Sequence, residues 1–157
     1  MSEAPLQFPE RVLDSPGFLM HQLLRRGRRM AEASPTGPQL PRLMVLASID
    51  EFGPHSQRDL CRRLGVDPSD MVAIIDRLEA DGHAVRERDP ADRRRHAIAI
   101  TPAGRTWMLE TSDGLSDRVA TFLPGLDEAD REQLVTLLRR ALAHADDRVP
   151  AAAQQAR

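Results

Sequence analysis

The sequence contains very few cysteine and aromatic residues and no lysine. Its 157 residues include one cysteine, no lysine, no tyrosine and only five aromatic side chains, four phenylalanines and one tryptophan. A single cysteine, Cys61, excludes an intramolecular disulfide framework and favours a reducing compartment. The scarcity of aromatic residues also weighs against a reader of single-stranded nucleic acid, because such proteins stack bases on aromatic side chains.

Long apolar segments are missing as well. The longest near-apolar run, Leu43 to Ile49, is far shorter than the roughly 18–20 residues that cross a bilayer. The N-terminal segment carries Glu3 and Glu10 and lacks the apolar stretch of a secretory signal. We therefore expect no membrane span and a cytoplasmic location. The length is that of one domain, by the usual range of roughly 100–200 residues, which excludes a large multidomain enzyme.

The overall charge predicts no particular partner. The chain has 22 basic residues, all of them arginine, and 24 acidic residues, which gives a formal net charge of −2. The complete use of arginine is most simply explained by a GC-rich coding genome, although the guanidinium group also suits phosphate and guanine. A preference for nucleic acid must therefore be read from where the charges lie.

Proline and glycine divide the chain into segments of helical length, and one segment alternates like a hairpin. We predict a mainly α fold of about six helices with one two-stranded β hairpin. The expected helices cover about 17–33, 39–51, 56–64, the stretch from Asp67 towards Gly82, 102–122 and 127–144. The expected strands are His83 to Arg88 and Arg95 to Thr101.

The segment after Asp67 has the features of a capped helix with one buried face. Asp67 is a candidate N-cap, Pro68 suits the first helical position, and Asp70 places a negative charge in the first turn. The apolar side chains recur at helical spacing on one face: Met71, Ile74, Ile75 and Leu78. The opposite face presents Ser69, Asp70, Val72, Ala73, Asp76 and Arg77.

A short helix, a glycine turn, a capped amphipathic helix and a hairpin follow the order of a winged helix-turn-helix, which suits double-stranded DNA. The second helix fits the major groove, and the hairpin can reach phosphates or a minor groove. The stretch from His55 to His96 holds nine arginines and nine acids, whereas Arg86 to Arg95 alone holds five arginines and three acids. The positive charge is thus concentrated in the wing, although three consecutive arginines are also compatible with a solvated loop.

These residues carry a family resemblance. The stretch "GVDPSDMVAIIDRLEADGHAVRERDPADRRRHAIAITPAG", from Gly65 to Gly104, resembles the multiple-antibiotic-resistance regulator (MarR) family of bacterial transcription factors. The most specific combination is the "DPADRR" wing followed by an alternating strand, "TPAG" and a long helix. In outline the resemblance extends from about Gly17 to His144.

The resemblance implies a homodimer that binds a pseudo-palindromic operator in double-stranded DNA, and it implies a ligand-responsive repressor. We then expect a flexible segment over 1–15, a single domain over 16–146 and a disordered tail over 147–157. Within the domain, helices at about 17–33 and 102–145 would form the dimer, and a winged helix-turn-helix lobe at about 39–101 would bind DNA.

The resemblance also assigns DNA contacts residue by residue. It implies base-facing positions in the second helix, a backbone contact at the start of the preceding helix, and the wing arginines. The expected DNA-binding residues are Gln57, Ser69, Asp70, Val72, Ala73, Arg77, Arg93, Arg94 and Arg95.

The chain departs from the family pattern at the base-facing pair, where many members have Thr and Arg and this chain has Val72 and Ala73. We infer that sequence choice relies partly on methyl contacts to thymine and partly on the shape of the groove at the wing. Arg77 is open to two interpretations, a phosphate contact or a surface ion pair with Asp76, Asp81 or Glu79.

The resemblance further implies a small effector, often aromatic or anionic, between the dimer helices and the DNA-binding lobe. Its expected lining includes His21, Arg25, Met44 and Met108, each of which is also explained as core or solvated surface. Cys61 lies on an apolar face and suits packing better than redox sensing.

No cofactor, metal or catalytic residue is expected. The histidines lack ligand spacing, and the sequence has no phosphate-binding glycine loop or nucleophile motif. An enzyme is therefore disfavoured. A second alternative is a winged helix used only as a protein-interaction module, since a fold alone does not fix function.

Overall fold

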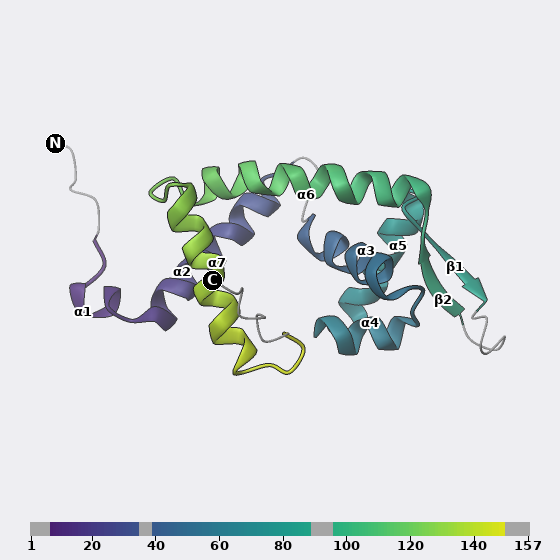
Figure 1. Cartoon of the computed structure of the whole chain (residues 1–157), viewed down its shortest axis with the longest axis horizontal. Coiled ribbons are helices and arrows are strands. Elements are labelled where there is room, and N and C mark those ends of the chain that lie inside the picture. The colour runs from purple at the N-terminus through teal and green to yellow at the C-terminus, as the bar shows by residue number, and fades with distance from the viewer. Residues whose placement is uncertain (1–6, 35–38, 89–95, 150–157) are drawn as a thin grey trace, which may run out of the picture. The chain divides into compact units, whose positions relative to one another are not determined.

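The computed structural model describes residues 7–34, 39–88 and 96–149, apart from the side chains of 115–118. The chain divides into two units, residues 1–39 and residues 40–157. In the described residues the elements are α1 (Glu10–Leu13), α2 (Pro16–Glu32), α3 (Leu40–Phe52), α4 (Gln57–Leu64), α5 (Pro68–Ala80), β1 (Ala84–Arg88), β2 (His96–Ile100), α6 (Pro102–Phe122) and α7 (Glu128–Ala143). The predicted mainly α fold with a two-stranded wing is confirmed (Figure 1).

The first unit consists of α1 and α2. The short α1 lies inside the segment 1–15, where the sequence predicted no element, and it begins after Pro9 with Glu10 in its first turn. Ser15 caps α2 by accepting a hydrogen bond from the Phe18 amide at 3.4 Å. No residue of α2 is buried. This helix carries exposed apolar side chains at Leu19, Met20, Leu23, Leu24 and Met30.

The second unit is built around α3, as its apolar sequence predicted. Val45, Leu46 and Ile49 of this helix are 0–2% exposed. They form one core with residues from α4, α5, the hairpin and α6, whose buried members are Leu60, Met71, Ile75, Leu78, Ala84, Ile98 and Met108. Burying one such side chain contributes about 1.5–3 kcal/mol, so this core accounts for the position of α5 against α3.

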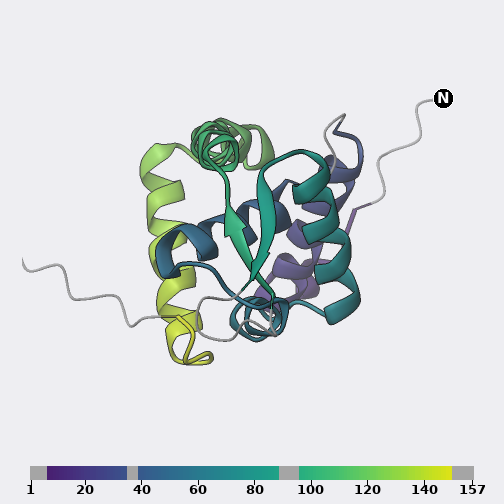
Figure 2. The same ribbon diagram turned by 90° about the vertical axis from the view of Figure 1, so that its right-hand side faces the viewer.

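The hairpin pairs β1 and β2 antiparallel, with Ala84 opposite Ile100 and Arg88 opposite His96. The expected alternation in β2 holds only in part. Ile98 is buried as predicted and Ile100 packs against the core, but Ala97 and Ala99 are buried too. A bridge between His55 and Ile98 covers the free edge of β2. Viewed from the wing side, α5 runs alongside the hairpin and α6 is seen end-on above it (Figure 2).

The "TPAG" stretch joins the hairpin to α6. Thr101 caps α6 through Oγ1, which accepts the Gly104 amide at 2.9 Å and donates to the Gly82 carbonyl at 2.7 Å. Pro102 occupies the first helical position. The Gly104 backbone lies so close to the His83 carbonyl that an added Cβ would be 1.9 Å from its oxygen. The first turn of α6 is therefore packed directly on the backbone of the turn that joins α5 to β1.

The elements lie close to the predicted ranges, and α6 and α7 end within two residues of them. No described helix is both long enough and apolar enough to span a bilayer. The predicted wing turn, Asp89 to Asp92, and most of the predicted tail 147–157 lie outside the described residues.

We expect Gly104→Ala to destabilise the protein, because its methyl group would overlap the His83 backbone. Overpacking of this kind costs about 1–3 kcal/mol, and each kcal/mol lowers the Tm of a chain of this size by about 2–4 °C. Gly114→Ala is the matched control in the same helix, since nothing lies within 4 Å of its added Cβ. Thermal unfolding should show a Tm loss for the first variant only, and equal Tm values would contradict the close contact.

Candidate nucleic-acid interface

The helix-turn-helix pair is shaped by its caps. Ser56 begins α4, accepting the Asp59 amide at 3.2 Å and donating to the Asp59 carboxylate at 2.6 Å. This hydrogen bond, with a further one from Arg62, lowers the pKa of Asp59 below its ordinary value. Gly65 then ends α4 in the left-handed conformation at φ 66°, which glycine adopts without steric cost. The turn allows α5 to begin three residues later.

The predicted N-cap of α5 is confirmed. One carboxylate oxygen of Asp67 accepts the Ser69 amide at 2.8 Å and the Ser69 hydroxyl at 2.6 Å. Both hydrogen bonds lower the pKa of Asp67. The Ser69 hydroxyl is thereby oriented at the exposed N-terminus of α5, with its oxygen lone pairs still able to accept a hydrogen bond.

The two faces of α5 differ as the sequence predicted. Met71, Ile75 and Leu78 are 0% exposed, and Ile74 packs against their cluster. The opposite face exposes Ser69, Asp70, Val72, Ala73, Asp76 and Arg77. Among these, Val72 is 41% exposed, which leaves its methyl groups accessible to a partner.

The other predicted DNA-binding residues are placed as follows. Gln57 is the first residue of α4 and is half-buried. Arg77 Nε lies 3.0 Å from the Asp81 carboxylate, so this structure contains one of the surface ion pairs that the sequence left open. Arg93, Arg94 and Arg95 lie outside the described residues.

Asp81, at the C-cap of α5, is the centre of a cluster that sequence reasoning missed. Arg42 of α3, buried to 8% exposure, places its Nη1 2.8 Å from the Asp81 carboxylate. The same guanidinium lies 5.0 Å from the centre of the Trp107 ring, on which His83 stacks. Burial lowers the pKa of His83. The one sequence signal for this cluster was an arginine between the apolar residues that begin α3.

The base of the wing is also joined to α5 by charge. Arg86 of β1 lies 2.8 Å from Asp76 through Nη2, and it pairs with Glu79 through Nη1. The Arg86 amide donates to the Glu79 carboxylate at 3.2 Å. The Asp76 hydrogen bond, more than the other interactions, raises the pKa of Arg86. The sequence places Arg86 among the wing charges but gives no sign of these partners on α5.

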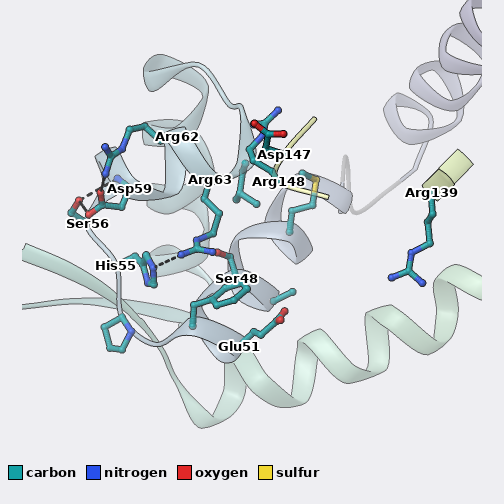
Figure 3. A pocket seen from close by; sticks show the side chains of 15 residues that line it. Ser48, Glu51, His55, Ser56, Asp59, Arg62, Arg63, Arg139, Asp147 and Arg148 are labelled. Atoms are coloured by element: carbon teal, nitrogen blue, oxygen red, sulfur yellow. Dashed lines mark hydrogen bonds and ion pairs between the residues drawn. The ribbon is translucent and has the colours of Figure 1, made fainter. Parts of the chain in front are cut away.

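A hollow of about 1140 Å³ lies within the second unit, lined mainly by α3 and α4 (Figure 3). Arg63 lies in it, with its guanidinium 4.0 Å from the Phe52 ring centre and Nη2 3.3 Å from His55. Ser48 is 6% exposed, and its hydroxyl has no hydrogen-bond partner. Arg62, Arg139 and Arg148 add positive charge to the lining, and Glu51, Asp59 and Asp147 add negative charge. The hollow is mixed in charge with an aromatic wall.

The predicted effector residues do not form one cluster among the described contacts. Met44 lines the hollow. Met108 is 7% exposed and belongs to the hydrophobic core. His21 and Arg25 are exposed on α2, in the other unit. Cys61 packs half-buried against the core, and among the described residues no three potential ligands are grouped to hold a metal ion.

The fold and this surface define a winged helix-turn-helix protein, the architecture that places one helix of a pair in a DNA groove. Comparisons with known proteins narrow the class. A model of the MarR family matches residues 36–95. Over these residues the chain is similar to the MarR family of winged helix-turn-helix transcriptional regulators.

Individual relatives agree with this assignment. The chain is 26% identical over 145 residues to the HTH-type transcriptional repressor NicR of Pseudomonas putida, covering 90% of this chain and 91% of NicR. It is 33% identical over 96 residues, 61% of its length, to a putative transcriptional regulatory protein for the hcr operon of Thauera aromatica, of which the match spans only 57%.

Among solved structures, Bordetella bronchiseptica BpsR superimposes with a TM-score of 0.66 at 25% identity, covering 88% of this chain and 97% of BpsR. That structure is described as a mechanism for regulation of DNA binding by 6-hydroxynicotinic acid. Members of the family thus bind DNA operators and small effectors such as aromatic acids.

Proposed function

We propose that this protein is a ligand-responsive repressor that binds a pseudo-palindromic operator in double-stranded DNA as a homodimer. The observation that carries the proposal is that α5 has one fully buried face and one exposed face. The N-terminus of this helix is capped by Asp67. A helix held in this way presents a fixed set of side chains to a major groove.

The exposed residues suggest how the groove is read. Val72 and Ala73 offer methyl groups to the thymine methyl, the Asp70 carboxylate can accept from cytosine N4, and Ser69 can bond to either kind of edge. Gln57, at the start of α4, suits a backbone phosphate. The wing arginines Arg93, Arg94 and Arg95 suit a narrow minor groove, whose potential favours arginine.

We expect Arg94→Ala to weaken operator binding by about 1–3 kcal/mol and to reduce the salt slope of binding by about one phosphate contact. Gel-shift titrations at several salt concentrations measure both quantities. Arg105→Ala is the control, because Arg105 is half-exposed on α6 and pairs with Asp50 away from the interface. Unchanged affinity for Arg94→Ala would contradict the wing contact, and no salt-sensitive binding by the wild type would favour a protein-interaction module.

The homodimer is supported by apolar surface that one chain leaves uncovered. Val135, Leu138 and Leu142 are 54%, 41% and 51% exposed, and their spacing places them on one face of α7. Leu109 and Val119 of α6, in the same unit, are exposed as well, and so are several apolar side chains of α2 in the other unit. Exposed apolar faces on helices are typical of association surfaces.

Sedimentation equilibrium at micromolar concentration should give about 35 kDa, twice the 17.5 kDa of one chain. Leu138→Glu should shift the mass towards the monomer, because a charge on the apolar face would be desolvated in the dimer. Thr136→Glu, on the opposite side of α7, is the matched control and should leave the dimer intact. A single-chain mass for the wild type would contradict the proposal.

A small aromatic acid is the proposed effector class. The hollow supports it, because Phe52 offers an aromatic wall, Arg63 a guanidinium beside that wall, and Met44 an adaptable apolar side chain. The other residues predicted from the sequence, His21, Arg25 and Met108, do not line this hollow. An effector of this kind would act by binding the DNA-free form more tightly than the DNA-bound form.

The effector proposal predicts reciprocal effects. 6-Hydroxynicotinic acid and benzoate should be tested as probes by calorimetry, with operator affinity measured at each ligand concentration. We expect ligand binding to weaken operator binding, and the operator to weaken ligand binding by the same factor. Arg63→Gln should reduce ligand affinity by about ten-fold, whereas the Arg105→Gln control should not. Equal ligand affinity in all three proteins would place the site elsewhere.

A further inference from the structure

We propose that Arg86 is a positioning residue for DNA binding, which fixes the base of the wing to the recognition helix α5 through Asp76 and Glu79. The inference rests on the proposed function, since it assigns a role within DNA binding. It concerns a residue that lies outside the predicted set of DNA contacts.

The geometry gives Arg86 two partners on one helix. Asp76 and Glu79 are three residues apart on α5 and therefore neighbours on its surface. The Arg86 guanidinium reaches both carboxylates with its two Nη atoms, and the Arg86 amide donates to Glu79 as well. A planar guanidinium that holds two carboxylates at once fixes direction as well as distance, which a single ammonium group cannot do.

The position of Arg86 along β1 allows this contact to hold the strand against α5. Side chains alternate along a strand, so Arg86 shares a face with Ala84, which is buried against the core. Beyond Ala84 no residue of β1 is buried, and the described strand ends at Arg88. Beyond Ala84 the core holds β1 through its pairing with β2, and Arg86 adds a direct side-chain connection between the exposed part of β1 and α5.

The contact also changes the charge of the recognition helix. Asp76 has a 57% exposed side chain on the same helix as the base-facing residues, where a free carboxylate would repel phosphates. Pairing with Arg86 neutralises it. The side chain of Arg86 itself is 35% exposed, so the network is partly shielded from solvent and less weakened by screening than a fully exposed pair.

Two variants separate positioning from a direct phosphate contact. Arg86→Gln removes the cation, and the double variant Asp76→Asn with Glu79→Gln keeps the cation but removes its partners. If Arg86 positions the wing, both variants weaken specific operator binding by about ten-fold or more, although the double variant loses two negative charges. If Arg86 instead contacts a phosphate, the double variant binds as tightly as the wild type or more tightly.

The measured quantities are the affinity for the operator, the affinity for a non-specific duplex, and the dependence of operator affinity on salt concentration. The Tm of each variant checks that it is folded. Positioning predicts a fall in the ratio of specific to non-specific affinity for both variants. A double variant that keeps the wild-type ratio, while Arg86→Gln lowers the salt slope by about one contact, would overturn it. Arg105→Gln is the matched control, because it breaks an ion pair with Asp50 on another surface and should change none of these values.

Failure of the positioning role can be distinguished from failure of the proposed function. Salt-sensitive operator binding by the wild type together with unchanged specific affinity for Arg86→Gln would overturn the positioning role and leave the proposed function standing. The absence of DNA binding by the wild type would overturn the proposed function and the positioning role together.

Discussion

The complete burial of one face of α5 is the constraint on which the rest of the surface depends. Met71, Ile75 and Leu78 have no exposed area, so the helix cannot rotate about its axis without exposing them to water. A rotation that exposed even one of them would cost about 1.5–3 kcal/mol. The polar face is therefore held in one orientation by apolar packing, and the identity of its residues can vary without altering where they point.

Local sequence signals predicted the parts of this arrangement that depend on neighbouring residues. The Asp67 cap, the Pro68 start and the apolar spacing from Met71 to Leu78 involve contacts within one helix, and the structure contains all of them. The hairpin and the long helix after Thr101 were predicted for the same reason. Helix bounds could be read to within a few residues because proline and glycine mark them.

Contacts between distant segments could not be predicted in this way. Arg42 and Asp81 are 39 residues apart, and no periodicity links an arginine of α3 to the C-cap of α5. Burial of Ala97 and Ala99 likewise depends on what packs over β2, which the alternation of its sequence does not encode. The effector residues were assigned by resemblance, and Met108 illustrates the limit, because the same apolar side chain suits a pocket wall and the core it occupies.

The contact between Gly104 and His83 has a consequence for how movement could pass through the protein. The first turn of α6 contacts the His83 backbone directly at Gly104, with no side chain between them. The two segments therefore cannot shift against each other by rearranging a side chain. The Thr101 hydroxyl joins the same two segments, because it is hydrogen-bonded to both Gly82 and Gly104. We therefore expect the start of α6 and the winged helix-turn-helix to move together. The distance between two such lobes in a dimer would then be set by the direction of α6, and adjusted by bending that helix or by sliding it against a second copy.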